Sequence, residues 1–178
     1  MILESQYWKN DLAQNVVFLH DKLHQKVWRD ASFAALEKRI MLSCYIVRKL
    51  AESKKITKEL FQQDITLYAY KNRGVAVDLL NSHKIQELYE VEKPQQIVKP
   101  FSYVVNQIIH SYTFIPTFQS KNELKGCLFN SDRSKKHEIY LLRIIDFIEA
   151  LSPIAQCYVG VTIMQRNSDG EMVVVQSE

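Results

Sequence analysis

The sequence predicts an α+β fold in which an N-terminal helical hairpin and a third helix pack on a small, mainly antiparallel C-terminal sheet. Apolar residues recur at steps of three and four early in the chain and again around residue 105. Beyond residue 112 the apolar runs become short, rich in β-branched and aromatic residues, and separated by turn residues. The length of 178 residues suits one ordinary domain. We therefore expect a single α+β domain, helical over about 5–112 and strand-rich over about 113–178.

Two amphipathic stretches form the predicted hairpin. The first runs from residue 5 to about 28, where one side of a helix carries Trp8, Leu12, Val16, Leu19, Leu23 and Val27. The second runs from about 32 to 54, with a stripe made of Phe33, Leu36, Ile40, Val47 and Leu50. Between them, residues 29–32 (Arg-Asp-Ala-Ser) supply side chains that can cap the second helix.

The middle of the chain carries weaker signals until a third helix begins. Thr57 can cap a short helix through Phe61, residues 66–70 alternate like a strand, and residues 75–97 show no pattern. Pro100 suits the first turn of a helix. The apolar stripe that follows consists of Phe101, Val104, Val105, Ile108, Ile109 and Tyr112, which predicts a helix over about 99–112.

The final third predicts strands joined by tight turns. Candidate strands cover residues 112–118, 124–129 and 138–144, and a short helix is expected to follow to Leu151. The clearest turn is Asp169-Gly170, which predicts a hairpin between residues 157–165 and 172–176.

Composition and charge restrict the classes of function. The net charge of +3 is too small to indicate a nucleic-acid or acidic-membrane partner by itself, although residues 1–56 carry a net of +4, so any anion preference should lie there. Cations near the end of the second helix suit its dipole.

The N-terminus lacks the features of a secretory signal and no apolar run is long enough to cross a bilayer. The three cysteines, Cys44, Cys127 and Cys157, are widely spaced, which is typical of buried thiols, and we expect a cytoplasmic protein with no membrane partner.

The polar side of the third predicted helix is the first candidate site. Tyr103, Asn106 and His110 lie at i, i+3 and i+7, close enough for a phenol, an amide and an imidazole to act on one bound molecule. Histidine exchanges protons near neutral pH, so the three are candidate catalytic residues. No Asp, Glu, Lys or Arg occurs from Phe101 to Ser120, which is unusual for a solvated face. Two interpretations stay open: the wet side of an amphipathic helix, or a face covered by another element or a ligand.

The same stretch resembles the signature of the HEPN superfamily, helical proteins that include ribonucleases. That signature is an arginine, often followed by a polar residue such as asparagine, four to six residues ahead of a histidine. Asn106 and His110 match it, whereas Val105 precedes the asparagine and the arginine is missing. The resemblance implies metal-independent cleavage of RNA, with His110 as general acid or base. Arg48 can replace the missing cation only if the second helix packs alongside the third.

A basic loop between two predicted strands is the second candidate site. Residues 131–137 include Arg133, Lys135 and Lys136, which together with Arg48 are candidate phosphate-binding residues. A charged hairpin loop can equally be solvated and bind nothing.

The stretch from His20 to His24 reads His-Asp-Lys-Leu-His and resembles the HExxH zinc-hydrolase motif, with aspartate in the glutamate position. Two imidazoles at i and i+4 can hold one metal ion. The aspartate is one methylene shorter than the expected base, and the sequence shows no third ligand. We therefore expect the two histidines to border the core stripe, and we assign neither a metal nor another cofactor.

Taken together, these features favour a soluble binding or accessory protein that acts through protein–protein contacts, with a partner protein or a second copy. The nine tyrosines, eight phenylalanines and two tryptophans exceed what one core holds, and surplus aromatic residues gather at interfaces. The competing hypothesis is a metal-independent ribonuclease or nucleotide-processing enzyme that uses His110 with Asn106, with nucleic acid as its partner. A zinc hydrolase at His20 and His24 is a third hypothesis.

Overall fold

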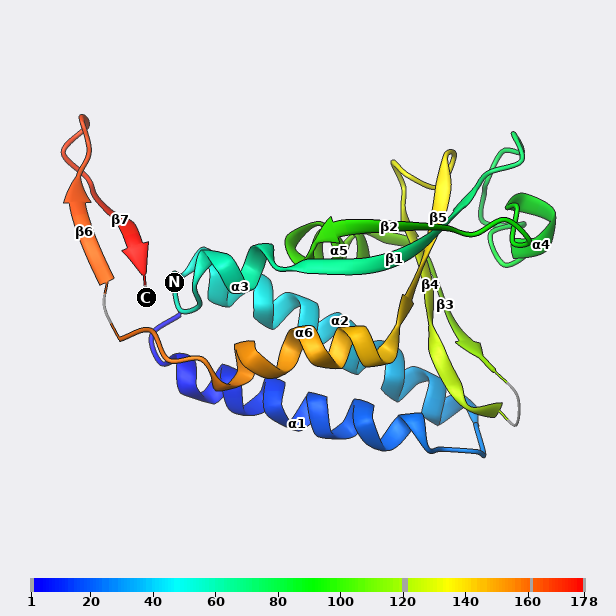
Figure 1. The fold of residues 1–178 in the computed structure, drawn as a ribbon, viewed down its shortest axis with the longest axis horizontal. Coiled ribbons are helices and arrows are strands. Elements are labelled where there is room, and N and C mark those ends of the chain that lie inside the picture. Colours follow the sequence, from blue (N-terminus) through cyan, green and yellow to red (C-terminus); the bar gives the residue numbers. More distant parts are fainter. Residues whose placement is uncertain (1, 120–121, 161, 178) are drawn as a thin grey trace.

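An antiparallel sheet lies across a layer of helices in the computed structural model (Figure 1), which confirms the predicted α+β class. The structure describes residues 2–119, 122–160 and 162–177. The helices are α1 (Ser5–Leu23), α2 (Asp30–Glu52), α3 (Lys58–Gln62), α4 (Ile85–Leu88), α5 (Phe101–Ile109) and α6 (Ile144–Gln156). The strands are β1 (Asp64–Lys71), β2 (Gln95–Pro100), β3 (Ser111–Phe118), β4 (Leu124–Ser131), β5 (Glu138–Arg143), β6 (Thr162–Arg166) and β7 (Met172–Ser177).

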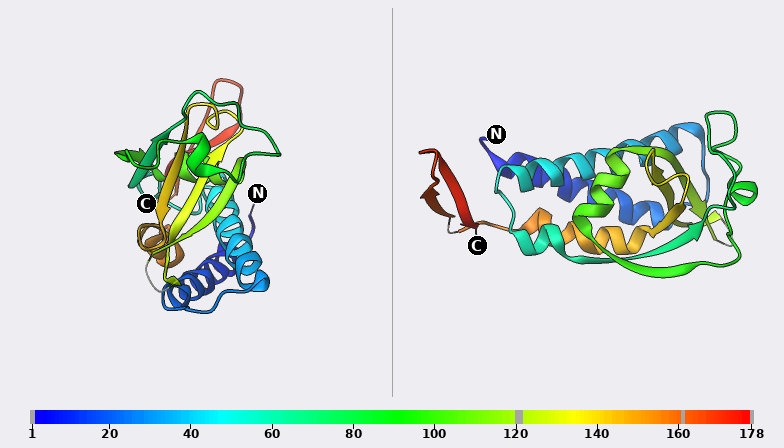
Figure 2. Two further views of the ribbon diagram at one scale, coloured as in Figure 1. Left: turned by 90° about the vertical axis from the view of Figure 1, so that its right-hand side faces the viewer. Right: turned by 90° about the horizontal axis from the view of Figure 1, so that it is seen from above.

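Within the described residues, five strands form the main sheet in the order β2-β1-β5-β4-β3, and each neighbouring pair is antiparallel. The strands β1 and β2 belong to the part of the chain that was expected to be mainly helical. The end-on view in Figure 2 places this sheet above α1, α2 and α6. The sheet therefore combines strands from both halves of the chain.

The predicted helical hairpin is confirmed, but its first helix is shorter than expected. The stripes of α1 and α2 are buried at Leu12, Leu19, Leu36, Ile40, Val47 and Leu50. The helix α1 ends at Leu23 rather than near residue 28 because the side chain of Trp28 is held elsewhere. Its indole nitrogen donates to the carbonyl oxygens of Gln25 and Asn122, each at 3.1 Å, and its ring packs edge-on against Phe118. Val27, which a longer helix would bury, is exposed.

The strand β2 was not predicted, because it is a polar edge strand. Most of its residues are exposed or half-buried, as is typical of an edge, and Pro100 ends it. The prediction that Pro100 lies in the first helical turn is wrong, since its backbone is extended with φ −64° and ψ 146°. The helix α5 begins only at Phe101.

The third helix is confirmed but ends three residues early. Its apolar face is fully buried at Phe101, Val104, Val105 and Ile108. His110 caps the helix, with its backbone N–H donating to the carbonyl of Asn106 at 3.1 Å. Pairing of Ser111 with Ser131 then draws the chain into β3, so Tyr112 belongs to a strand.

Apolar residues fill both faces of the sheet, so two cores form. The inner face packs against α1, α5 and α6 through residues such as Leu67, Phe129 and Leu142, and α2 packs on α1 and α5. The outer face carries Leu128, Ile139 and Leu141, and part of it is covered by the segment 72–94, which contributes Val77, Leu88 and Tyr89. This segment, without a pattern in the sequence, therefore closes the second core.

The C-terminal part forms a longer helix and a hairpin that stands away from the main sheet (Figure 1). The helix α6 continues to Gln156, five residues beyond the expected end at Leu151. The predicted hairpin is present as β6 and β7, with Gly170 at a φ of 81° in its turn, but β6 begins at Thr162 rather than at residue 157. An irregular stretch over 157–160 connects the helix to the hairpin.

Gly126 on β4 lies so close to β5 that no side chain fits. A Cβ atom at this position would be 2.2 Å from the carbonyl oxygen of Leu142. We expect Gly126→Ala to lower the free energy of unfolding by about 3 kcal/mol or more, because backbone atoms must shift. Gly74→Ala is the control: its φ of 81° is unfavourable but the space is open, so about 1 kcal/mol is expected. Urea unfolding measures both, and equal losses would contradict the packing argument.

The thiols of Cys44 and Cys127 make the stability depend on alkaline pH. Both are buried, and burial raises the pKa of each thiol far above its ordinary value. In the unfolded chain they ionise near pH 8.5, so the unfolded state releases protons first and stability is lost as the pH rises above that value. We expect each thiol to contribute a loss of about 2 kcal/mol between pH 8.5 and 10, measured by urea unfolding. The double variant Cys44→Ala/Cys127→Ala should show a shallower fall, and an unchanged slope would refute the assignment.

Candidate functional site

The three candidate catalytic residues of α5 have different surroundings. The hydroxyl of Tyr103 lies 2.7 Å from that of Tyr140 on β5, which in turn donates to the carboxylate of Glu138 at 2.5 Å. Burial, and then the hydrogen bond to Glu138, raises the pKa of Tyr140. Asn106 and His110 are exposed instead. The structure therefore joins α5 to the sheet through Tyr103, which is half-buried, and leaves Asn106 and His110 exposed.

His110 lies beside Arg48, because α2 packs against α5. The Nη1 atom of Arg48 is 3.4 Å from Nε2 of His110. The same guanidinium binds the carboxylate of Glu52 one turn further along α2, with 2.9 Å between Nε and Oε1. Arg48 can replace the missing arginine of the HEPN signature only if the second helix lies alongside the third. The structure meets this condition, because α2 lies alongside α5.

The basic loop between β4 and β5 is held against α5 by a side chain that the sequence did not single out. Oε1 of Gln107 accepts hydrogen bonds from the backbone of Ser131 at 3.2 Å and from the hydroxyl of Ser134 at 3.0 Å. Helical spacing places Gln107 on the polar side of the helix, and this was the sequence signal that could have identified it as a contact residue.

Of the candidate phosphate-binding residues in this loop, Lys135 already has partners. It pairs with Asp132 at 2.8 Å, and its ammonium lies 3.3 Å from the centre of the Tyr112 ring. The bond to Asp132 raises the pKa of Lys135 and lowers that of Asp132. Arg133 and Lys136 are exposed, so they are the cations that the loop offers to solvent.

The two histidines of the zinc-like motif lie at the exposed end of α1. Their ring centres are 5.9 Å apart, and His24 is already the cap residue that follows the helix. Lys22 between them interacts with Gln25 and lies over the ring of Phe18. Among the described residues, no group of three His, Cys, Asp or Glu side chains is placed to hold a metal ion.

A groove between α1 and α2 is a feature that sequence reasoning missed. It encloses about 710 Å³ and is lined by Tyr7, Trp8, Asp11, Asn15, Ala35, Lys38, Arg39, Leu42, Tyr45 and Ile46. Tyr7 is 73% exposed, Tyr45 46% and Leu42 43%. Leu42 and Tyr45 fall outside the core stripe of α2, and apolar residues off the stripe were the signal that could have revealed this surface.

Polar side chains beneath the groove hydrogen-bond to one another. The buried side chain of Asn15 donates to the hydroxyl of Ser43 at 3.1 Å and accepts from Nη1 of Arg39 at 2.6 Å. These bonds join the two helices across the groove. Asn15 and Ser43 are almost fully buried, so Arg39 is the member of this network that a bound molecule would contact.

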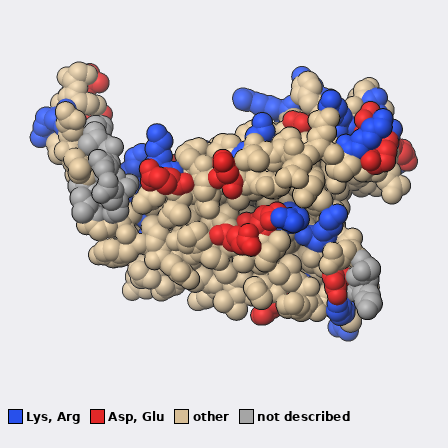
Figure 3. All heavy atoms as spheres, viewed as in Figure 1, with Lys and Arg blue, Asp and Glu red and all other residues tan. Residues whose placement is uncertain are grey.

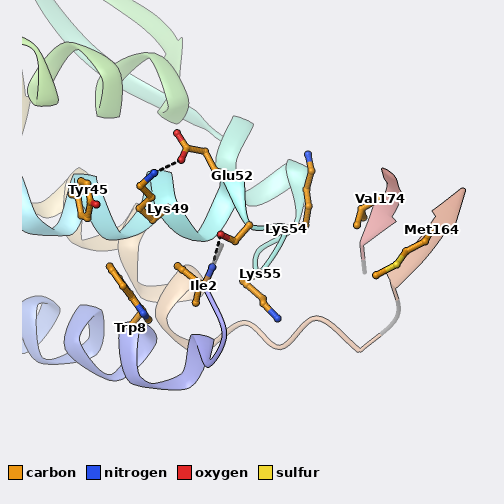
Figure 4. Close-up of a pocket in the computed structure, with 10 residues that line it drawn as sticks. Ile2, Trp8, Tyr45, Lys49, Glu52, Lys54, Lys55, Met164 and Val174 are labelled. Carbon is orange, nitrogen blue, oxygen red and sulfur yellow. Dashed lines mark hydrogen bonds and ion pairs between the residues drawn. The ribbon is translucent and has the colours of Figure 1, made fainter. Parts of the chain in front are cut away.

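Trp8 and Tyr45 also line a second hollow, of about 630 Å³, at the end of α2 (Figure 4). Their ring centres are 6.3 Å apart. Met164 and Val174 of the β6–β7 hairpin line the far side of this hollow. The face of the helix layer in view in Figure 3, over α1 and α6, carries few charged side chains apart from one central cluster. The face of the helix layer in this view thus offers mainly uncharged surface.

No helix in the described part of the chain has both the length and the apolar composition needed to span a bilayer. Comparison of the chain with protein-family models, with curated proteins and with solved structures finds no match. The possible roles of three features therefore rest on their geometry: the groove, the Arg48–His110 pair and the exposed basic loop.

Proposed function

We propose that this protein is a protein-binding module, in which the groove between α1 and α2 receives an amphipathic helix of a partner protein. The observation that carries the proposal is the set of aromatic and aliphatic side chains that stand exposed along the groove. Burial of one such side chain stabilises a complex by about 1.5–3 kcal/mol. Tyrosine and tryptophan are also the residues that contribute most to binding at protein interfaces.

The shape of the groove favours a helix as its occupant. Two neighbouring helices leave a furrow into which the side-chain ridges of a third helix fit. A helix bound in this way presents apolar residues at spacings of three and four, and these can contact Tyr7, Leu42 and Tyr45. We infer that the partner segment is amphipathic, with a narrow apolar stripe.

The polar groups of the groove support one orientation of that helix. Asp11 lies on the α1 side, whereas Lys38 and Arg39 lie on the α2 side. Opposite charges on the two rims favour a partner helix whose flanks carry the complementary charges, since charge complementarity selects partners and fixes register.

The proposal predicts that Leu42→Arg weakens partner binding without unfolding the protein. Because Leu42 is already 43% exposed, the thermal midpoint should stay the same, while affinity falls by about 2 kcal/mol or more. Val98→Arg is the matched control, since Val98 is 55% exposed on the edge strand β2. A photoreactive residue at position 42 identifies the contacted segment, and calorimetry with that segment measures the affinity of each variant.

Two results of this experiment would contradict the proposal. Equal loss of binding in Leu42→Arg and Val98→Arg would place the interface elsewhere. Cross-linking from position 42 only to a second copy of this chain would make self-association, rather than a partner helix, the role of the groove.

A second candidate function, metal-independent cleavage of RNA, has one specific observation in its favour. The 3.4 Å distance between Arg48 and His110 brings a permanent cation beside an exposed imidazole. In this hypothesis His110 is the general acid or base, Arg48 stabilises the charge on the phosphate, and Asn106 orients the substrate. Arg133 and Lys136 would attract the RNA backbone.

Cleavage of labelled RNA in EDTA tests this second function. If His110 transfers a proton, His110→Ala should lower the rate at least about 100-fold, and Arg48→Ala should lower it about as much. His137→Ala is the control, because His137 is an exposed histidine on the β4–β5 loop. Equal rates in all variants, or no cleavage by the wild type, would remove the Arg48–His110 pair from consideration.

A further inference from the structure

The hollow at the end of α2 continues the line of the groove between α1 and α2. Five side chains of α2 line these two spaces at steps of three and four: Lys38, Leu42, Tyr45, Lys49 and Glu52. The first two line the groove, the last two line the hollow, and Tyr45 lines both. Residues at such steps share one side of a helix. A single stripe of α2 therefore runs from the groove into the hollow.

The helix α1 and the chain before it supply the opposite wall. Asp11 lines the groove, Ile2 lines the hollow, and Trp8 lines both. The rings of Trp8 and Tyr45, whose centres are 6.3 Å apart, thus lie where the two spaces meet. Tyr45 is 46% exposed, so a molecule that lies along the groove can pass over its ring. The boundary between groove and hollow is therefore an aromatic surface that belongs to both.

The β6–β7 hairpin forms the far wall of the hollow. Among the described residues its two strands pair only with each other, and an isolated two-stranded hairpin is marginally stable in water. The side chains of Met164 and Val174 point from the hairpin into the hollow (Figure 4). Met164 is nevertheless 56% exposed. An apolar molecule in the hollow would cover these side chains and supply the packing that the hairpin lacks.

The length of the stripe sets the length of a helix that could cover it. Lys38 and Tyr45 are about two turns apart, whereas Lys38 and Glu52 are about four turns apart, which is about 21 Å. A helix that fills only the groove needs about two turns, and one that also enters the hollow needs about four. Because helices of two turns are poorly stable in water, the longer occupant is favoured.

We propose that the groove and the hollow are one binding site, in which a partner helix of about four turns lies along α2 and its end contacts the β6–β7 hairpin. This inference rests on the proposed function, because it concerns the same partner helix. The end of that helix in the hollow is apolar, since Ile2, Met164 and Val174 line this part of the site. The flexible side chain of methionine can adapt to the surface that it meets there.

Binding of the partner peptide by two methionine variants tests the inference. The peptide is the segment that cross-links to position 42, and calorimetry measures its dissociation constant. Met164→Glu should weaken binding about tenfold or more, because it places a charge against the apolar end of the peptide. Met172→Glu is the matched control, since Met172 is 55% exposed on the same hairpin but is not among the residues that line the hollow. The control should bind like the wild type, and both variants should keep the wild-type thermal midpoint.

The possible results separate this inference from the proposed function. Equal dissociation constants in the wild type and Met164→Glu, with weaker binding by Leu42→Arg, would overturn the inference and leave the groove as the binding site. Equal constants in all these proteins, or no partner segment cross-linked from position 42, would overturn both.

A shortened peptide gives a second measurement. Removal of two turns from one of its ends should weaken binding to the wild type and leave binding to Met164→Glu unchanged, because that contact is already lost in the variant. If shortening at either end weakens binding to both proteins equally, the peptide does not reach the hairpin and the inference is wrong.

Discussion

Burial of α5 between α2 and the inner face of the sheet is the interaction on which the other features depend. Phe101, Val104, Val105 and Ile108 are fully buried, and this single short helix touches both layers. Because its apolar face is fixed, the direction of each of its polar side chains is fixed as well. Tyr103 meets the sheet, Gln107 holds the β4–β5 loop, and His110 lies beside α2.

The open surfaces of the protein follow from its layered construction. A helix layer packed on a sheet buries only the side of each helix that faces the sheet. The outer side of the α1–α2 pair therefore keeps its aromatic side chains exposed, and these form the groove. The sheet differs, because the segment 72–94 covers part of its second face and makes another core there. The start of α1 and the end of α2 meet the chain after α6, where the ammonium of Lys9 donates to the carbonyl oxygen of Cys157.

The candidate site was only partly predictable. Helical spacing placed Tyr103, Asn106 and His110 on one side of a helix, yet spacing says nothing about what covers that side. Tyr103 is engaged by Tyr140 because β5 lies opposite it, whereas Asn106 faces solvent. The groove was not predicted because the periodicity of α2 identifies the stripe that faces the core and leaves Leu42 and Tyr45 without an assignment.

The sequence by itself determined the local elements whose signals lie within a few residues: the stripes of α1, α2 and α5, and the Asp169-Gly170 turn. The positions of the helix ends depend on the tertiary structure. Trp28 is an example, because its ring packs against Phe118 on β3 and the helix ends before it. The same holds for contacts between residues far apart in the chain. Arg48 and His110 are 62 residues apart, and Lys9 and Cys157 are 148 apart. Such contacts are decided by how buried faces pack together, and local periodicity contains no information about which faces meet.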